Sequence, residues 1–454
     1  MNAPREPRII QGKLAASPTG WLAWLNNDAG FRALAWLFAA TVLVFGAIPV
    51  ENAVLDASAK DYELWHETGQ RVLKGEAIYP AVTKKFPFMY PPPCAIFLAP
   101  VSLLGQTGVV IAGGIVNAIA WFACILLAVR LATGARRRQH VLLYVLPSLV
   151  VAVYAWSNFH LGQPSLILLA LMLGAFLALQ QKRGAVAGAL IGFAAAIKAF
   201  PVIAIVYLVY RRYWTAAASL VGTIVLLFVL LPMPVRGFDQ ARTDLERWTA
   251  GMLFKYDDTG MAQRPGRSNS WKNQSIWGVA NRLLRNVDAD DQHAAHTPLY
   301  VNVADLSFAT VNKLILATAL LLGLMYVAVM PRQRAATAES FALETALLLL
   351  LVLLFTPLVF GYLFAWLLYP LTVVVHRLMQ QPSRSLVVCA AGALALLALT
   401  IPLQRIAQAY GNTFFATLLL FAGLAIELWR IKAPAPELPR TREASTHPTS
   451  AVAA

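Results

Sequence analysis

Asp61 is the residue on which most of the interpretation of the sequence depends. It opens a polar stretch, residues 61–93, that follows the first long apolar segment and reads DYELWHETGQRVLKGEAIYPAVTKKFPFMYPPP. An acid at the edge of such a segment is costly unless it has a use, and a positioned carboxylate can accept a proton from a reacting hydroxyl. The stretch therefore predicts a catalytic base at Asp61. The spacing also fits an ordinary helix, with Asp61 as its N-cap and Gly75 as its stop.

Further polar side chains that can bind a substrate are scattered along the chain. They lie in the same stretch as Asp61, in the segment SNFHLGQ, at a break in an apolar run and in a late polar region: Tyr79, Tyr90, His160, Gln163, Lys198, Asn273 and Gln274. Residues so far apart in sequence act together only if the fold brings them to one place. The elements that carry them must therefore be considered next.

Composition indicates a membrane protein. Of the 454 residues, 59% are hydrophobic and 13% are charged, whereas soluble domains average about 25% charged residues. Apolar runs of 18 or more residues recur, each long enough to cross a bilayer as a helix, so we expect an all-α polytopic protein with about 11–13 membrane helices. The net charge of +15 does not indicate a nucleic-acid partner, because Arg and Lys lie in short loops, as membrane orientation signals do.

The apolar runs predict where the spans lie. Residues 184–212 differ from the others because they predict two short helices broken at Lys198–Pro201. A short amphipathic helix is expected to begin at Asp61, with Leu64, Trp65, Val72 and Leu73 able to lie on the bilayer. The full-length spans are expected at residues 31–50, 108–131, 141–156, 164–179, 215–231, 307–330, 337–356, 361–380, 385–403 and 411–431.

Charge sets the expected orientation. With the N-terminus in the cytoplasm, and with residues 184–212 entering the membrane and returning, the basic short loops all fall inside, except for Arg405. The long polar regions, residues 51–107 and 232–306, then lie outside. Lys198 follows about 14 helical residues, so it stands roughly 21 Å from the inner face and is expected to reach toward the outer side. Asp61 and the other polar candidates thus converge on the outer face.

Several short motifs occur in a fixed order along the chain: Asp61-Tyr62 with Gly75 and Tyr79, Tyr90-Pro91-Pro92, Gly162-Gln163, Ala196-Ile197-Lys198 with Pro201 and Arg211-Arg212, Asn273-Gln274-Ser275, and Thr356-Pro357 with Tyr362. This ordered set resembles glycosyltransferase family 87, a family of C-type membrane glycosyltransferases. The resemblance implies a mannosyltransferase-like enzyme of the cytoplasmic membrane that moves a hexose from polyprenyl phosphate to a glycolipid or glycan on the outer face. It also implies that the base of the first outer loop is Asp61 and that Tyr362 lies at the substrate, although members often have Trp or His near this position.

The chemistry of such a transfer assigns the remaining roles. A single carboxylate base suits one inverting displacement, because a retaining double displacement needs a second carboxylate nearby. The leaving phosphate needs a cation, for which the candidates are Lys198, Arg264, Arg267 and Lys272. No cofactor is expected, and the spacing of the three cysteines does not suggest a metal site. Substrate binding is assigned to Tyr79, Tyr90, His160, Gln163, Asn273, Gln274 and Tyr362.

Plainer alternatives stay open for these assignments. Asp56 is a rival base, and Lys198 can be a membrane anchor. Gln163 and Gln274 can simply bind loop backbone, the aromatic residues can form an interfacial belt, and Arg264 with Arg267 can bind lipid headgroups. For the whole protein the alternatives are a transporter or flippase of lipid-linked sugars, built on the broken helix, and a membrane scaffold. The expected segments are a cytoplasmic tail at residues 1–30, one transmembrane domain at 31–431 and a disordered cytoplasmic tail at 432–454.

Overall fold

The computed structural model describes residues 21–432, except for residues 56, 81–87, 254–268, 291–296 and 334–336. Within these ranges every regular element is a helix. Three residues considered above, namely Asp56, Arg264 and Arg267, lie outside the described residues.

Long apolar helices dominate the described part of the chain. Eight are long and apolar enough to cross a membrane: α2 (Asp28–Val54), α5 (Gly105–Thr133), α6 (Leu142–Leu161), α10 with η2 and α11 (Trp214–Arg236), α14 (Phe308–Val329), α15 (Ala338–Phe355), η5 with α16 (Gly361–Gln380), and α19 (Asn412–Lys432). A ninth span results if α17 (Arg384–Ala398) and α18 (Thr400–Ala409) count together, although the two meet at 94°. The prediction of an all-α polytopic membrane protein is confirmed.

Four shorter apolar helices explain the difference between these spans and the 11–13 that the sequence predicted. Each has 10–17 residues, fewer than the roughly 20 that a full crossing needs. They are α4 (Pro92–Ser102), α7 (Ser165–Gln180), α8 (Gly184–Ile197) and the pair η1 with α9 (Phe200–Tyr210). Three of the four are consecutive in the chain, so the middle of the protein is built from short apolar pieces.

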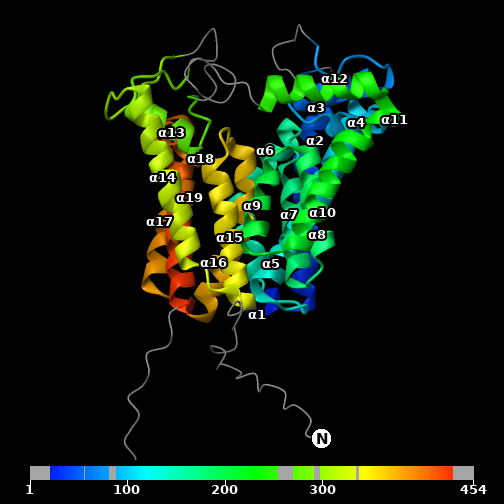
Figure 1. Ribbon diagram of the computed structural model, residues 1–454. Coiled ribbons are helices and arrows are strands. Elements are labelled where there is room, and N and C mark those ends of the chain that lie inside the picture. The colour runs from blue at the N-terminus through cyan, green and yellow to red at the C-terminus, as the bar shows by residue number, and fades with distance from the viewer. Residues whose placement is uncertain are drawn as a thin grey trace, which may run out of the picture.

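The helices of the polar regions gather at one end of the bundle. Figure 1 shows α1 (Trp21–Leu25) at the lower end and, at the upper end, α3 (Asp61–Leu73), α4, α11 (Pro232–Arg236), α12 (Phe238–Trp248) and α13 (Ile276–Leu284). We call these the α1 end and the α3 end. The first basic loop lies at the α1 end, where Arg138 pairs with Asp28 at the start of α2. The first basic loop and the polar regions therefore occupy opposite ends.

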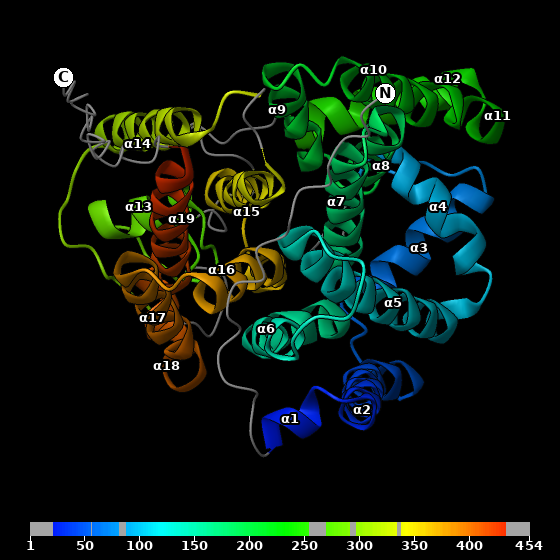
Figure 2. The same cartoon turned by 90° about the horizontal axis from the view of Figure 1, so that it is seen from below.

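Two groups of helices flank a central pair, α15 and α16. Figure 2 shows α13, α14, α17, α18 and α19 on one side of this pair, and α3, α4, α5, α7, α8 and α10 on the other. The share of buried residues is 72% for α15 and for the span at Gly361–Gln380, but only 6% for α2. Trp366 and Tyr369 are among the largest fully buried side chains. The core therefore follows the central pair, while α2 exposes an apolar surface of the kind that faces lipid.

The segment around Lys198 turns back as the sequence predicted. α8 ends at Ile197, Lys198 is extended (φ −148°, ψ 125°), and the chain returns through η1 and α9 (Ala204–Tyr210). The two ends of the segment lie close together. Gly184, at its start, is so near Thr215, just after its end, that a Cβ added to Gly184 would stand 3.2 Å from the Thr215 side chain. α8 also packs tightly on α10, since a Cβ on Gly188 would stand 2.1 Å from a backbone oxygen of α10. Small residues allow this close approach.

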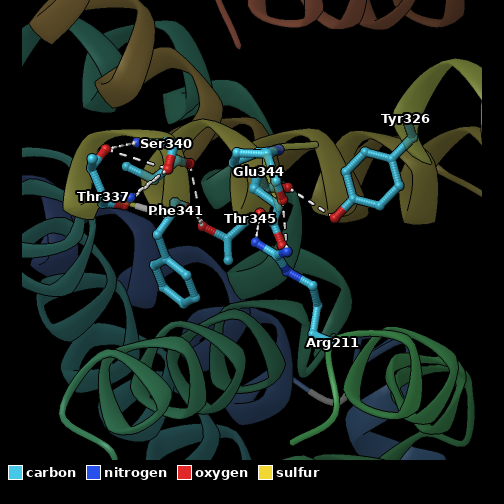
Figure 3. Close-up of polar contacts among 9 residues, drawn as sticks. Arg211, Tyr326, Thr337, Ser340, Phe341, Glu344 and Thr345 are labelled. Carbon is cyan, nitrogen blue, oxygen red and sulfur yellow. Dashed lines mark hydrogen bonds and ion pairs between the residues drawn. The ribbon is translucent and has the colours of Figure 1, made fainter. Parts of the chain in front are cut away.

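A buried ion pair ties the return point of this segment to α15 (Figure 3). Nη2 of Arg211 lies 2.5 Å from Oε2 of Glu344, and Nη1 donates to the Pro331 carbonyl at 2.9 Å. The hydroxyl of Tyr326 donates to the Glu344 carbonyl at 3.2 Å, so α14 joins the same contact. Removing one partner of such a pair leaves a buried charge and typically costs about 3–5 kcal/mol. The pair therefore fixes α9 against α15 at the α1 end.

The predicted span at residues 385–403 is wrong in shape, because the chain bends sharply there. The side-chain amide of Asn412, at the start of α19, donates to the Leu396 carbonyl and to the Thr400 hydroxyl, both at 2.8 Å. These contacts fasten α19 to both sides of the bend. Arg405, the exception to the charge rule, lies in α18 and pairs with Asp290 at 2.9 Å. Its charge is thus matched by a carboxylate of the second polar region.

Candidate active site

Asp61 begins α3 directly after a strained residue. Lys60 has φ +55° and ψ −130°, a conformation that costs a non-glycine residue about 1–3 kcal/mol. Lys60 occupies the N-cap position, so the plainer interpretation of Asp61 as the N-cap is wrong. The Asp61 carboxylate instead belongs to the first turn, where the helix dipole stabilises a negative charge. The strained residue and the helix start together fix the position of this carboxylate.

Tyr62 locks α3 against the end of α6. Its hydroxyl donates to the Phe159 carbonyl at 2.9 Å, and its ring lies 3.0 Å from where a Cβ on Gly162 would stand. Gly162 has φ +71°, a conformation that glycine adopts without strain. Trp65 and Val72 are buried on the same side of α3. The prediction that residues of α3 lie on the bilayer is therefore wrong for Trp65 and Val72, which pack on protein, whereas Leu73 is exposed.

Gln163 links Asp61 to Tyr90. Nε2 of Gln163 donates to Oδ2 of Asp61, and the Tyr90 hydroxyl donates to Oε1 of Gln163 at 3.3 Å. Gln163 is 5% exposed and Tyr90 is 7% exposed, so both links are shielded from solvent. The plainer alternative, in which Gln163 only binds loop backbone, is wrong, because its side chain bonds to two other side chains.

Lys198 joins this group from the helix break. Its ammonium nitrogen lies 5.7 Å from the centroid of the Tyr90 ring and 5.0 Å from that of the Tyr362 ring, within the range of a cation–π contact. The charges of Lys198 and Asp61 also interact. One carboxylate, one ammonium and two tyrosines thus form a single cluster from four separate parts of the sequence. We call Asp61, Tyr90, Gln163, Lys198 and Tyr362 the central cluster.

Asn273 and Gln274 hold backbone near the central cluster. Asn273 accepts from the Val359 amide at 3.0 Å and donates to the Pro357 carbonyl at 3.1 Å, just before Tyr362 in the chain. The Gln274 amide donates to the carbonyls of Trp271 and Gln408 at 2.8 and 2.7 Å. These contacts favour the plainer interpretation of Gln274, and they give Asn273 a role in shaping the loop that leads to Tyr362.

Tyr79 and His160 lie around the central cluster. The Tyr79 hydroxyl donates to the Tyr90 carbonyl at 2.6 Å, and burial raises the pKa of Tyr79 well above its usual value. His160 stacks on Trp156 with ring centroids 5.3 Å apart, and its buried Nδ1 has no hydrogen-bond partner among the described residues. Tyr79 therefore supports the backbone of Tyr90, while His160 packs on Trp156 at the end of α6.

The remaining cation candidates are placed differently. Lys272 is exposed, and its ammonium lies 5.1 Å above the ring of Trp271. Arg264 and Arg267 lie outside the described residues, as stated above. No group of three or more His, Cys, Asp or Glu side chains that could hold a metal occurs in the described ranges. Lys198 is thus the cation candidate that the structure brings to Asp61.

Two important residues were missed by sequence reasoning. Arg282, fully buried in α13, donates to the carbonyls of Ser270 and Asn273 at 2.7 and 2.8 Å and to that of Ala409 at 3.0 Å. Burial lowers the pKa of its guanidinium to about 9. Asn158 donates to the Tyr362 carbonyl at 2.9 Å and accepts from the Ser165 amide. A polar residue inside an apolar helix was a usable signal for Asn158, whereas nothing in the sequence marked Arg282.

A cavity lies away from the central cluster. It has a volume of about 500 Å³ between α13, α17, α18 and α19, and its lining includes Leu283, Leu399 and Ile406 but no residue of the central cluster. Its lining contains no acidic or basic side chain. The central cluster, by contrast, contains both the carboxylate of Asp61 and the ammonium of Lys198, which share Tyr90 and Gln163 as neighbours.

Comparison with known proteins agrees with the resemblance. No curated protein matches the chain. The model of glycosyltransferase family 87 matches residues 88–357, which include Tyr90, Gln163 and Lys198 but neither Asp61 nor Tyr362. The protein is thus a multi-pass membrane glycosyltransferase. This finding favours an enzyme over the transporter, which was the alternative that the broken helix suggested. Because the match spans more than half of its 454 residues, the chain belongs to glycosyltransferase family 87.

Proposed function

We propose that the protein transfers a hexose, such as mannose, from a polyprenyl-phosphate carrier to a hydroxyl of an envelope glycolipid or glycan. The observation that carries this proposal is the convergence of the Asp61 carboxylate and the Lys198 ammonium on Tyr90, which bonds to the Gln163 amide that meets Asp61 and lies beside Lys198. An acid that can accept a proton and a cation that can meet a phosphate are the two groups that such a transfer needs.

In the proposed reaction Asp61 accepts the proton of the acceptor hydroxyl. The hydroxyl oxygen forms a bond to the anomeric carbon of the sugar while the bond from that carbon to the phosphate oxygen breaks. The electron pair of the broken bond stays on the carrier phosphate, and the ammonium of Lys198 stabilises this charge. One displacement with a single base inverts the anomeric configuration.

The surroundings of Lys198 support it as the phosphate ligand. Tyr90 and Tyr362 place two ring faces next to its ammonium, which keeps the charge in position without neutralising it. Lys272 has one ring beside it and is exposed, so solvent screens its charge more strongly. We assign Arg264, Arg267 and Lys272 to a secondary role with the carrier phosphate, and Tyr362 and His160 to contacts with the sugar or acceptor.

We place the reaction at the outer face of the cytoplasmic membrane. The basic loop with Arg138 lies at the α1 end, and Asp61 begins a helix of the opposite end. Cytoplasmic loops carry an excess of Lys and Arg, so the α3 end would face the periplasm or exterior. A carrier lipid that presents its sugar at that surface would reach both Asp61 and Lys198.

A transfer assay with the full chain in nanodiscs tests the proposal. A panel of polyprenyl-phosphate hexoses is supplied with extracted glycolipids as acceptors, and the wild type is compared with Asp61→Asn and with Glu63→Gln as a matched control. Glu63 is an exposed acid on the same helix. Asp61→Asn is expected to lose about 10²–10⁴-fold in rate, as removal of a general base does, and the control is expected to stay active. Retention of most of the rate by Asp61→Asn overturns the mechanism, and loss with Asp56→Asn instead moves the base to Asp56.

A further inference from the structure

Gln163 stands at a point where the backbone leaves it little freedom. It follows Gly162, the left-handed residue that ends α6, and precedes Pro164 and α7. Its backbone N–H donates to the Asn158 carbonyl at 3.0 Å, and the residue is 5% exposed. Its side chain reaches across to α3, which lies 102 positions earlier in the chain. A buried amide held in this way can act on its neighbours but has little room to follow a mobile substrate.

With Asp61 ionised, the hydrogen bonds of Gln163 have one consistent direction. An ionised carboxylate accepts hydrogen bonds and donates none, so the NH₂ group of the amide must face Asp61. The amide oxygen then faces Tyr90, whose hydroxyl donates to it at 3.3 Å. Reversal of the amide would set its oxygen against the carboxylate. The arrangement is therefore satisfied when Asp61 is ionised, the form that can accept a proton.

Tyr90 is itself held firmly. Its carbonyl accepts from the Tyr79 hydroxyl at 2.6 Å, and its ring lies 5.8 Å from that of Trp65 and 5.3 Å from that of Phe88. The ammonium of Lys198 lies 5.7 Å from the same ring. The Tyr90 side chain therefore touches the amide that orients the base and also the cation on the other side of the site.

We propose that Gln163 is a positioning residue that orients Asp61 and favours its ionised form, and that it does not bind substrate as the sequence had suggested. This inference rests on the proposed function, in which Asp61 is the base. A hydrogen bond donated to a carboxylate stabilises the charged form, and buried bonds of this kind are stronger than exposed ones. Loss of Gln163 should therefore slow the chemical step and leave donor binding nearly unchanged.

The test compares Gln163→Met with Gln70→Met in the nanodisc transfer assay. Gln70 lies on α3, and its amide donates to the Ser102 carbonyl at 3.0 Å, so its loss also removes a Gln hydrogen bond of α3 but leaves Asp61 alone. We expect kcat of Gln163→Met to fall roughly 10- to 100-fold with donor KM unchanged, and Gln70→Met to stay close to wild type. A raised donor KM with normal kcat would instead assign Gln163 to substrate binding.

The pH profile separates positioning from a merely structural role. Without the hydrogen bond from Gln163, Asp61 should take up its proton at higher pH. The acidic limb of the kcat/KM profile should therefore move to higher pH in Gln163→Met. Among the described residues, the titratable or charged groups near Asp61 include Lys198 and Tyr90, with Tyr362 and Cys94 beside these two. An unmoved limb in a slow variant overturns the inference. If Gln163→Met does not fold, the same pH profile is measured for Tyr90→Phe, which removes the hydroxyl that orients the Gln163 amide. Its acidic limb should also move to higher pH, and an unmoved limb in a slow variant overturns the inference.

Failure of this inference can be told from failure of the proposed function. If Asp61 is the base and Gln163 acts through it, Gln163→Met should add no further loss in the Asp61→Asn background. A further loss there shows that Gln163 acts independently of Asp61 and overturns the inference alone. An active Asp61→Asn variant overturns both.

Discussion

Tyr362 offers a sharp test of how Lys198 is held, because the replacement Tyr362→Leu removes one of the two rings beside the ammonium. The ammonium lies 5.0 Å from the Tyr362 centroid and 5.7 Å from the Tyr90 centroid, so the nearer ring is lost. A cation–π contact contributes about 0.5–1 kcal/mol when exposed and about 2 kcal/mol when desolvated. Lys198 is half-buried, which places the expected loss at about 1–2 kcal/mol.

That loss should appear in the affinity for the donor. If the ring keeps the ammonium where the carrier phosphate binds, about 1–2 kcal/mol corresponds to a rise of about 5- to 30-fold in donor KM. The assay titrates polyprenyl-phosphate hexose against nanodisc enzyme at fixed acceptor. Tyr362→Phe is the matched control, since it keeps the ring and removes only the hydroxyl.

The two variants give distinct results. Tyr362→Phe near wild type, with Tyr362→Leu impaired, supports the cation–π role. Equal impairment of both would show that the hydroxyl matters and that the ring does not hold Lys198. Wild-type behaviour of Tyr362→Leu would refute the reasoning altogether, because the nearer ring would then contribute nothing to the position of the cation.

Three further predictions concern charge, stability and orientation. Lys198→Gln should raise donor KM more than Lys198→Arg, which keeps the charge, and equal values for the two would reduce Lys198 to an anchor. Arg282→Met should lower the melting temperature strongly, because several buried carbonyls lose their donor at about 1–3 kcal/mol each, whereas the exposed Arg242→Met should not; similar melting curves would contradict this. An impermeant thiol reagent should label a Cys at position 63 in intact cells and leave one at position 137 unlabelled, and the reverse pattern would invert the orientation.

The sequence predicted the turn at Lys198 but not the bend between α17 and α18. A lysine followed by Pro201 within an apolar run is a local signal, and the structure breaks α8 there. Residues 385–403 carry no comparable signal that outweighs their apolar character. Their bend is fastened by Asn412, whose amide reaches back to Leu396 and Thr400 across the next loop. Contacts between separate helices determine this bend, and a local sequence pattern carries no information about such contacts.

The sequence predicted several residues of the candidate site but not the contacts between them. Polar residues in apolar surroundings pointed to Gln163 and Lys198, and the structure places both beside Asp61. The partner of Gln163 lies 102 positions away, so no spacing rule could supply it. The apolar side of α3 was recognised by its period, but a period does not tell whether protein or lipid covers it, and the structure buries Trp65 there.

The ion pair between Arg211 and Glu344 has a consequence for the time course of biosynthesis. Its two residues are 133 positions apart, which corresponds to about 7–27 s of translation at 5–20 residues per second. During that interval α8 and α9 have emerged, yet α15 does not exist to hold them. Tyr362, the nearer ring beside Lys198, emerges later still. Until α15 arrives, α8 can pack on α10, but Arg211 lacks its carboxylate partner. The cation of the site therefore gains its final surroundings among the last events of assembly.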